Sequence, residues 1–213
     1  SFYSSVSYLN NEGITTKSNY ERLTARMKAD YQVKEWLKVG ANMSYTHYDA
    51  NSLGEDGVSN SSGNIFAYAT QIAPIYPLYI RDAQGNLMKD ENGFTMYDYG
   101  STQGQYSSFG LERPYLTGGN AYAANLLDTN NDEGNAINAT GFLEIRFLKD
   151  FKFTWTSGVD VDETRSTSVT NPYYGQYATS NGIVGKAHSR SLSYNHQQLL
   201  NYTKTINDVH NLN

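Results

Sequence analysis

Tyrosine is the residue type in this 213-residue sequence that offers most to a ligand, with 19 copies. Its ring can stack on a sugar ring or a peptide side chain while its hydroxyl forms a hydrogen bond at the edge. We expect the tyrosines of one long polar stretch to contact a substrate. The alternative is that they pack this stretch onto itself or onto a neighbouring subunit. The tyrosines in question are Tyr68, Tyr76, Tyr79, Tyr97, Tyr99, Tyr106 and Tyr115.

In two stretches of the sequence, apolar residues occupy every second position, and several of the positions between them carry charged side chains. Paired carboxylates can act as acid and base in glycoside hydrolysis, but charges that alternate with apolar residues are typical of the wet interior of a β-barrel. We therefore expect these residues to face an aqueous lumen, and we expect no enzyme activity. They are Arg22, Arg26, Lys28 and Asp30 in the first stretch and Asp160 and Asp162 in the second.

One short acidic stretch has the oxygen spacing of a calcium loop. Asp128, Asn130 and Asp132 would supply oxygens at positions 1, 3 and 5 of such a loop. The glycine comes one place late, at Gly134, and position 12 is Ala139 instead of a bidentate glutamate. The three oxygen-bearing residues are a calcium candidate, but a solvated loop tip is the interpretation that the two departures favour.

Other common chemistries find no support in the sequence. The chain has no cysteine, which excludes a disulfide framework, a cysteine zinc cluster and a thiol nucleophile. Its four histidines share no spacing, and no glycine-rich phosphate loop is present, so we expect neither a metal centre nor a cofactor. The net charge of −5 carries no basic footprint, and we expect no nucleic-acid partner.

Long strands must position these residues, because hydrophobic and polar residues alternate over unusually long runs. In the first clear run, Leu23 and Met27 fall on one side, and Arg26 and Lys28 fall on the other. A period of two over ten or more residues predicts strands far longer than the ~5–6 residues of an ordinary strand. We expect six strands, near residues 2–9, 20–33, 36–48, 137–148, 151–162 and 191–204.

Tight turns alternate with long loops along this set of strands. The turns near 34–35 and 148–150 are tight, whereas residues 49–135 and 163–190 lack alternation and are predicted loops. Within the first loop, two turn sequences predict a small surface hairpin. Tight turns on one side and long loops on the other are typical of outer-membrane barrels. The predicted fold class is therefore all-β, an antiparallel segment of a large transmembrane β-barrel with long extracellular loops.

The composition is compatible with this fold class but does not select it. Only 38% of the residues are hydrophobic and the mean hydropathy is −0.61. No apolar run approaches the roughly 18 residues of a membrane helix. A β-sandwich also alternates apolar and polar residues along its strands. A secreted or surface β-sandwich that binds carbohydrate through exposed tyrosines is therefore the alternative.

Several stretches, in sequential order, resemble the barrel of SusC/RagA-type outer-membrane transporters. Residues 2–14 (FYSSVSYLNNEGI) are similar to a barrel segment of that family, as are 20–26 (YERLTAR) and 36–42 (WLKVGAN). Residues 74–79 (PIYPLY) and 97–100 (YDYG) are similar to motifs of its large extracellular loop. The ordered set covers essentially the whole chain.

The resemblance implies that residues 1–213 are part of one β-barrel domain of about 22 strands, here without the family's N-terminal plug domain. It also implies a location in the bacterial outer membrane, contact with its lipid, and import of oligosaccharides or peptides. The implied partners are a SusD-like surface lipoprotein, the TonB complex acting through an N-terminal region, and a second transporter–lipoprotein pair in a dimer.

Overall fold

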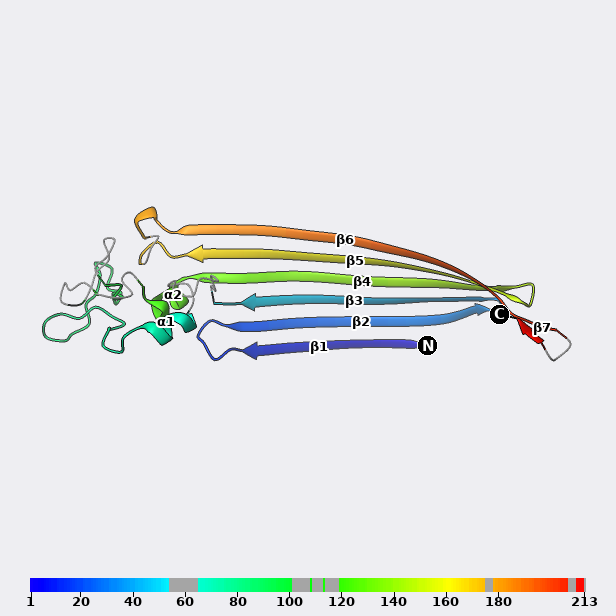
Figure 1. Cartoon of the computed structure of the whole chain (residues 1–213), viewed down its shortest axis with the longest axis horizontal. Helices are drawn as coiled ribbons and strands as arrows, with labels where there is room; N and C mark the ends of the chain where they lie inside the picture. Colours follow the sequence, from blue (N-terminus) through cyan, green and yellow to red (C-terminus); the bar gives the residue numbers. More distant parts are fainter. Residues whose placement is uncertain are drawn as a thin grey trace.

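The computed structural model describes residues 1–53, 65–100, 108, 113, 119–174, 178–206 and 210–212. Most of these residues form one long antiparallel sheet whose strands follow the order of the sequence (Figure 1). The predicted all-β, antiparallel fold is confirmed, and the sheet is open rather than closed over the described strands. The strands are β1 (Phe2–Glu12), β2 (Asn19–Lys34), β3 (Leu37–Asn51), β4 (Thr129–Phe147), β5 (Phe151–Thr170) and β6 (Ile183–Tyr202).

The two ends of the sheet differ, and we call them the turn end and the loop end. Tight turns join β2 to β3 and β4 to β5 at the turn end, and a short hairpin extends from it (Figure 1). Short helices lie at the loop end, and none among the described residues is long and apolar enough to cross a membrane. These smaller elements are α1 (Ile65–Gln71), α2 (Ala121–Leu127), η3 (Ala178–Ser180), β7 (Lys204–Ile206) and β8 (His210–Leu212).

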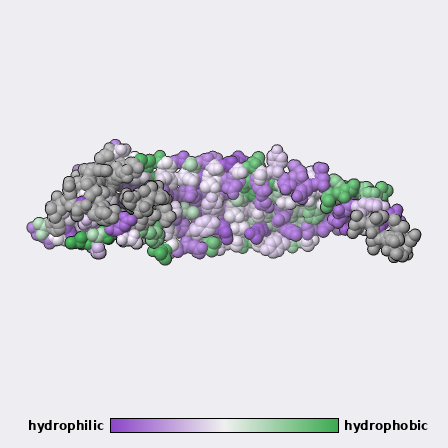
Figure 2. Space-filling view, in the orientation of Figure 1, coloured by the Kyte–Doolittle hydropathy of each residue, from purple (hydrophilic) through white to green (hydrophobic). Residues whose placement is uncertain are grey.

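The strand register gives the sheet one apolar face and one polar face. Met27 of β2 pairs with Met43 of β3, whereas the neighbouring row pairs Arg26 with Ser44. Because successive side chains of a strand point to opposite faces, this difference is repeated from row to row. In Figure 2, hydrophilic and weakly polar side chains cover most of the visible sheet, and hydrophobic side chains gather near the turn end.

No second sheet covers the apolar face in the part of the chain that the structure describes. Met27 and Met43 are 49% and 48% exposed, and Leu23 is 40% exposed. A β-sandwich would bury such side chains between two sheets, so the described strands do not form the sandwich of the alternative interpretation. The buried hydrophobic residues lie instead in the loop region and are Ile80, Met96, Tyr99, Ala121 and Ala123.

Three strands extend eight residues further toward the loop end than the sequence predicts, and β1 and β3 extend three residues further, to Glu12 and Asn51. β4 begins at Thr129 instead of near 137, β5 ends at Thr170 instead of near 162, and β6 begins at Ile183 instead of near 191. The predicted loops therefore include residues that are strand. In the extensions of β4 and β5 polar residues occupy both faces, and in that of β6 the apolar residues Ile183 and Val184 lie on opposite faces. The alternation of apolar and polar residues is therefore lost, although the backbone pairing between strands continues.

The calcium candidate falls in one of these extensions. Asn130 and Asp132 lie within β4 and are paired with β5. Asp128 follows the last turn of α2, and its Oδ1 accepts hydrogen bonds from the backbone N–H and the side-chain amide of Asn171. A strand spreads alternate side chains along its length and cannot wrap them around an ion as a loop does. These positions form neither a calcium-type loop nor a loop tip, and the described residues contain no group of three His, Cys, Asp or Glu side chains placed to hold a metal ion.

Candidate functional site

The six charged residues that were predicted to face a lumen all lie on the polar face. Arg26 of β2 shares a row with Ser44, Asn138 and Asp160 of the next three strands. Basic residues of β2 are thus about 14 Å from carboxylates of β5, at the usual spacing between strands. Whether this face lines a lumen stays a prediction. The six residues are Arg22, Arg26, Lys28, Asp30, Asp160 and Asp162.

Near the loop end, a glycine makes room for a large ring on the polar face. A Cβ atom added at Gly134 of β4 would lie 2.2 Å from Cε1 of Tyr48. The Tyr48 hydroxyl hydrogen-bonds with Oγ1 of Thr164 at 3.0 Å, and its ring stacks on Tyr20 with centroids 6.2 Å apart. Residues of three other strands, β2, β4 and β5, therefore fix the position of this ring.

An open hollow of about 810 Å³ lies at the loop end of the sheet. We call it the rim hollow. Among the described residues, its polar-face side chains on β4 and β5 form no hydrogen bonds, so their amide, carboxylate and hydroxyl groups are available to a ligand. The polar-face residues that line it are Asn11, Tyr20, Asn130, Asp132, Ser166 and Ser168.

A second, smaller hollow of about 250 Å³ lies further along the same two strands, toward the turn end. We call it the inner hollow. Asp160 and Asp162 of β5 line it together with Asn138, whose side-chain amide donates a hydrogen bond to Asp160. The alternation of the sequence puts the two aspartates on one face of their strand, but it indicates neither hollow. Both are assembled from strands that are distant in sequence, and no local motif marks them.

Beyond the loop end, residues 78–100 form a repeated structure that the sequence analysis missed. We call it the octapeptide unit, because a hydrophobic residue recurs every eight positions at Ile80, Met88 and Met96. The backbone N–H of Ile80 donates to the Met96 carbonyl (3.0 Å), that of Met88 to Ile80 (2.9 Å), and that of Met96 to Met88 (3.1 Å). The predicted hairpin of 78–80 with 87–89 is therefore present, and the third segment, which was not predicted, closes on both of its strands.

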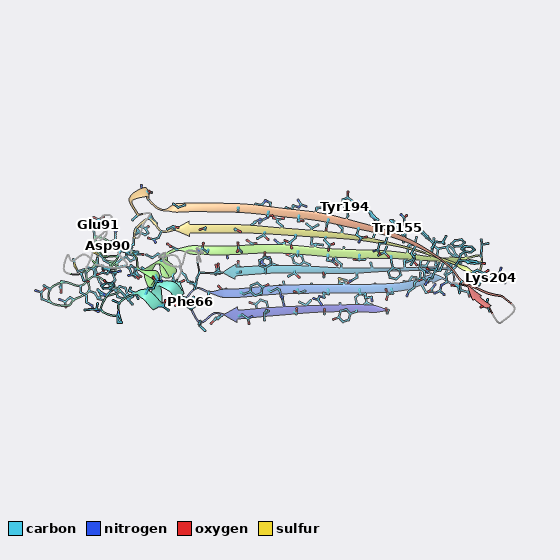
Figure 3. The ribbon with its side chains drawn as sticks, in the orientation of Figure 1. Phe66, Asp90, Glu91, Trp155, Tyr194 and Lys204 are labelled. Atoms are coloured by element: carbon cyan, nitrogen blue, oxygen red, sulfur yellow. The ribbon has the colours of Figure 1, made fainter. Side chains whose placement is uncertain are left out.

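Each of the two tight turns in the octapeptide unit is held by an aspartate and a glycine. Oδ1 of Asp82 accepts hydrogen bonds from the backbone N–H groups of Gln84 and Asn86, and Oδ1 of Asp90 is bonded in the same way two and four residues on. Gly85 and Gly93 have φ values of +88° and +84°, which side-chain-bearing residues rarely adopt. In the loop region of Figure 3, Asp90 lies far from Lys204 at the opposite end of the molecule.

A buried ion pair anchors the third segment of the octapeptide unit. Nη2 of Arg113 lies 2.9 Å from Oδ1 of Asp98, and the two side chains are only 5% and 3% exposed. The carboxylate also accepts from the backbone N–H groups of Gly100 and Ser108. Arg113 in turn donates to the carbonyls of Asp98 and Gly119. Both buried charges therefore contribute hydrogen bonds that hold the loop region together.

The predicted substrate tyrosines that the structure describes pack on other rings or on a cation. Tyr79 and Tyr97 are 5.3 Å apart between ring centroids, and Tyr99 stacks on Tyr174 at 5.9 Å. Tyr99 is 2% exposed and has no surface for a substrate, and Tyr76 lies under the guanidinium of Arg113. The geometry favours the alternative in which these rings pack the loop onto itself. Tyr106, Tyr115 and the side chain of Tyr68 lie outside the described residues.

The packed rings of Tyr79, Tyr97, Tyr99, Tyr122 and Tyr174, which we call the tyrosine cluster, also change the pKa of two of their hydroxyl groups. The pKa of Tyr79 is raised above its usual value, because its hydroxyl hydrogen-bonds with Tyr122 and because it is partly desolvated. Burial likewise raises the pKa of Tyr97. Both hydroxyls therefore stay protonated at neutral pH and act as hydrogen-bonding groups.

Contacts between the two long loops fix them relative to each other. The ring of Tyr174, which follows β5, touches Tyr97 at 5.5 Å in addition to Tyr99. Asn171, at the base of the same loop, is 4% exposed and is held by the carboxylate of Asp128 at the end of α2. Both loops consequently join the sheet within a few residues of the rim hollow.

Comparison with known proteins shows a likeness of fold. No protein-family model matches the chain, and no curated protein matches it. A structure of the RagAB peptide importer in the "closed-closed" state matches 97% of this chain with a TM-score of 0.62 and 24% identity. Structures of the RagAB peptide transporter and of the importer in the "open-open" state each match 99% of it, with TM-scores of 0.64 and 25% identity. The chain spans about a fifth (21%) of the length of each of those chains.

Proposed function

We propose that this chain is part of the wall and outer loops of a bacterial outer-membrane importer of oligosaccharides or peptides. The observation that carries the proposal is the continuous apolar face, opposite a polar face, on strands of 11 to 20 residues. The likeness to RagAB importer chains supports the same assignment, although it extends over about a fifth of each of those chains.

The height of the apolar face matches a bilayer. On β4 it extends from Ile137 to Phe147, ten residues apart. At ~3.4 Å per residue and a tilt of about 40°, this stretch spans about 26 Å, close to the ~25 Å apolar band of outer-membrane barrels. Phe151, at the turn end, packs on Phe147 and Tyr202 with centroids 5.5 and 4.8 Å away. Such clustered rings suit the aromatic girdle at a membrane interface.

The unpaired edges of β1 and β6 imply further strands. Backbone N–H and C=O groups cannot be left without partners in lipid, so only a closed barrel is stable there. In the proposed assembly additional strands complete the barrel, and the charged polar face contacts water or a plug domain. A SusD-like lipoprotein would cover the loop end, and the TonB complex would supply energy from the periplasmic side.

Single cysteines test the topology, because this chain contains none of its own. In the full-length protein, with any other cysteine replaced, Glu91→Cys should react with a membrane-impermeant maleimide on intact cells. Lys204→Cys, at the opposite end (Figure 3), should react only after the outer membrane is permeabilised. Met43→Cys, on the apolar face, should stay protected in both conditions. Equal labelling at all three positions would refute the membrane assignment.

Uptake tests the importing role separately. Deletion of the gene for the full-length protein should abolish growth on one class of oligomer, glycan or peptide, as sole nutrient, and a plasmid copy should restore it. Unchanged growth of the deletion strain on every glycan and peptide supplied would overturn the proposed function even if the labelling results agree with the topology.

A further inference from the structure

We propose that the rim hollow binds the main chain of an extended peptide of neutral or positive charge, which runs along β4 and β5 toward the inner hollow. This inference rests on the proposed importing function and selects between its two substrate classes. It is carried by the spacing, chemistry and charge of side chains on the polar face.

The first argument is the availability of hydrogen-bonding groups. Two other residues that line the rim hollow already have partners: Asn51 and Asn131, on the opposite face of their strands, bond to each other and to Asp49. In contrast, Asn130 and Asp132 of β4 have no side-chain partner among the residues that the structure describes. Ser166 and Ser168, their neighbours on β5, are in the same situation. A ligand can therefore engage these groups without breaking bonds within the protein.

The second argument is their repeat distance. Asn130 and Asp132 are two residues apart on one strand, as are Ser166 and Ser168, so each pair presents polar groups at an interval of ~6.8 Å. An extended peptide presents its backbone N–H and C=O groups along one edge at the same interval. The asparagine amide offers both a donor and an acceptor, and the serine hydroxyls can serve as either. The spacing and the hydrogen-bonding capacity of the two pairs of side chains therefore match those of an extended peptide main chain.

The third argument concerns what the rim hollow lacks. Sugar recognition commonly uses a free aromatic face. Among the described residues that line the hollow, Tyr20 is the only aromatic one, and its ring stacks on Tyr48. The loop tyrosines nearest in sequence, such as Tyr79 and Tyr97, pack on one another. The described lining therefore fits a peptide main chain better than a sugar ring.

The fourth argument is charge. The described lining of the rim hollow includes Glu12 and Asp132 and no basic side chain. Further along the same face of β5, Asp160 and Asp162 line the inner hollow. Because opposite charges attract most strongly where water is partly excluded, a lysine side chain or a free amino terminus is favoured along this path and an acidic side chain is disfavoured.

The test uses the full-length protein in detergent and isothermal titration calorimetry. The probes are an acetylated and amidated hexapeptide of alanine and serine with one lysine, the same peptide with glutamate in place of lysine, and maltohexaose. The triple variant Asn130→Ala, Ser166→Ala, Ser168→Ala removes three hydrogen-bonding groups. At about 1 kcal/mol for each bond, it should weaken binding of the lysine peptide at least ~10-fold. Ser157→Ala, on the opposite face of β5 and outside the lining of both hollows, is the matched control and should leave the affinity unchanged.

The expected result is that the lysine peptide binds most tightly and that only the triple variant weakens it. Maltohexaose binding that depends on the same three residues would overturn the inference and leave the importing function intact. Peptide binding that the triple variant does not weaken, or absence of binding by both peptides, would also overturn it. Both variants must keep the heat-modifiable electrophoretic mobility of a folded barrel, so that lost binding is not lost folding.

Discussion

The buried ion pair between Asp98 and Arg113 should decide whether the octapeptide unit folds. In the variant Arg113→Met, the Asp98 carboxylate keeps the backbone N–H groups of Gly100 and Ser108 but loses its only described cationic partner. Removing one member of a buried ion pair typically costs 3–5 kcal/mol, because an uncompensated charge is left in a poorly solvated place. At 3% exposure, Asp98 cannot recover this cost from water.

Hydrogen exchange followed by mass spectrometry can measure this cost in the full-length protein. A loss of 3–5 kcal/mol predicts exchange roughly 10²- to 10⁴-fold faster in peptides from 78–100, up to the rate of an unprotected chain. Peptides from β2 to β5 should exchange as before, because the sheet has its own backbone ladder. Glu91→Ala, an exposed position in the same unit, is the matched control and should change little.

A double variant separates the ion pair from simple loss of packing. Arg113→Met combined with Asp98→Asn removes both charges, and the oxygen of the neutral amide can still accept a hydrogen bond from one of the two backbone N–H groups, which donate to different oxygens of Asp98. It should therefore be less destabilised than the single variants together predict, with a coupling energy of about 1–3 kcal/mol. The reasoning is refuted if Arg113→Met accelerates exchange less than tenfold in 78–100. It is also refuted if β2 to β5 open to the same extent, since loop and sheet would then be one cooperative unit.

Three further predictions concern the apolar face, the polar face and the tyrosine cluster. Ala41→Arg, near the middle of the apolar face, should cost about 2–4 kcal/mol of barrel stability, whereas Asn42→Arg on the polar face should be tolerated. The free energy of folding into lipid vesicles, measured by urea titration, tests both variants. Gly134→Ala should displace the ring above it and cost about 1–3 kcal/mol. Gly158→Ala should cost little, because the added Cβ would lie 3.6 Å from its nearest neighbouring atom. The same urea titration distinguishes the two variants. Because the pKa of Tyr79 is raised in the folded loop, its stabilising contribution is complete below pH 10.0 and is lost as pH rises further. A spectrophotometric titration should show that Tyr79→Phe removes one of the latest-ionising tyrosines, and an unchanged titration would contradict this.

The strands were predictable from the sequence wherever one face is apolar. In β2, the contrast between Met27 and its neighbours Arg26 and Lys28 fixes which side of the strand faces which environment, and the register follows from it. The contrast vanishes beyond the apolar face, where both sides of the strand meet water. The eight-residue extensions of β4 and β5 were missed for this reason, since only the backbone pairing with a neighbouring strand maintains them. The extension of β6 was missed because its few apolar residues lie on both faces and give no alternation.

The octapeptide unit was missed for a different reason, although a signal was present. Aspartates recur every eight residues at Asp82, Asp90 and Asp98, each two residues after a hydrophobic residue, and glycines recur at Gly85 and Gly93. A search for internal repeats would have found this period. It would not have found the role of Asp98, which depends on an arginine fifteen residues further along the chain. Burial of Tyr99 was equally out of reach, because its stacking partner comes from the other long loop.

Ligand binding in the rim hollow and packing of the two loops should be linked through the strand ends they share. Asp128 holds Asn171 at the base of the second loop, and two residues later Asn130 lines the hollow. A strand paired on both sides cannot shift one of these positions without the other. The sheet therefore provides a rigid base on which the loops are mounted, and any movement of the loops must come from the segments between their anchors, not from the strands that carry the hollow.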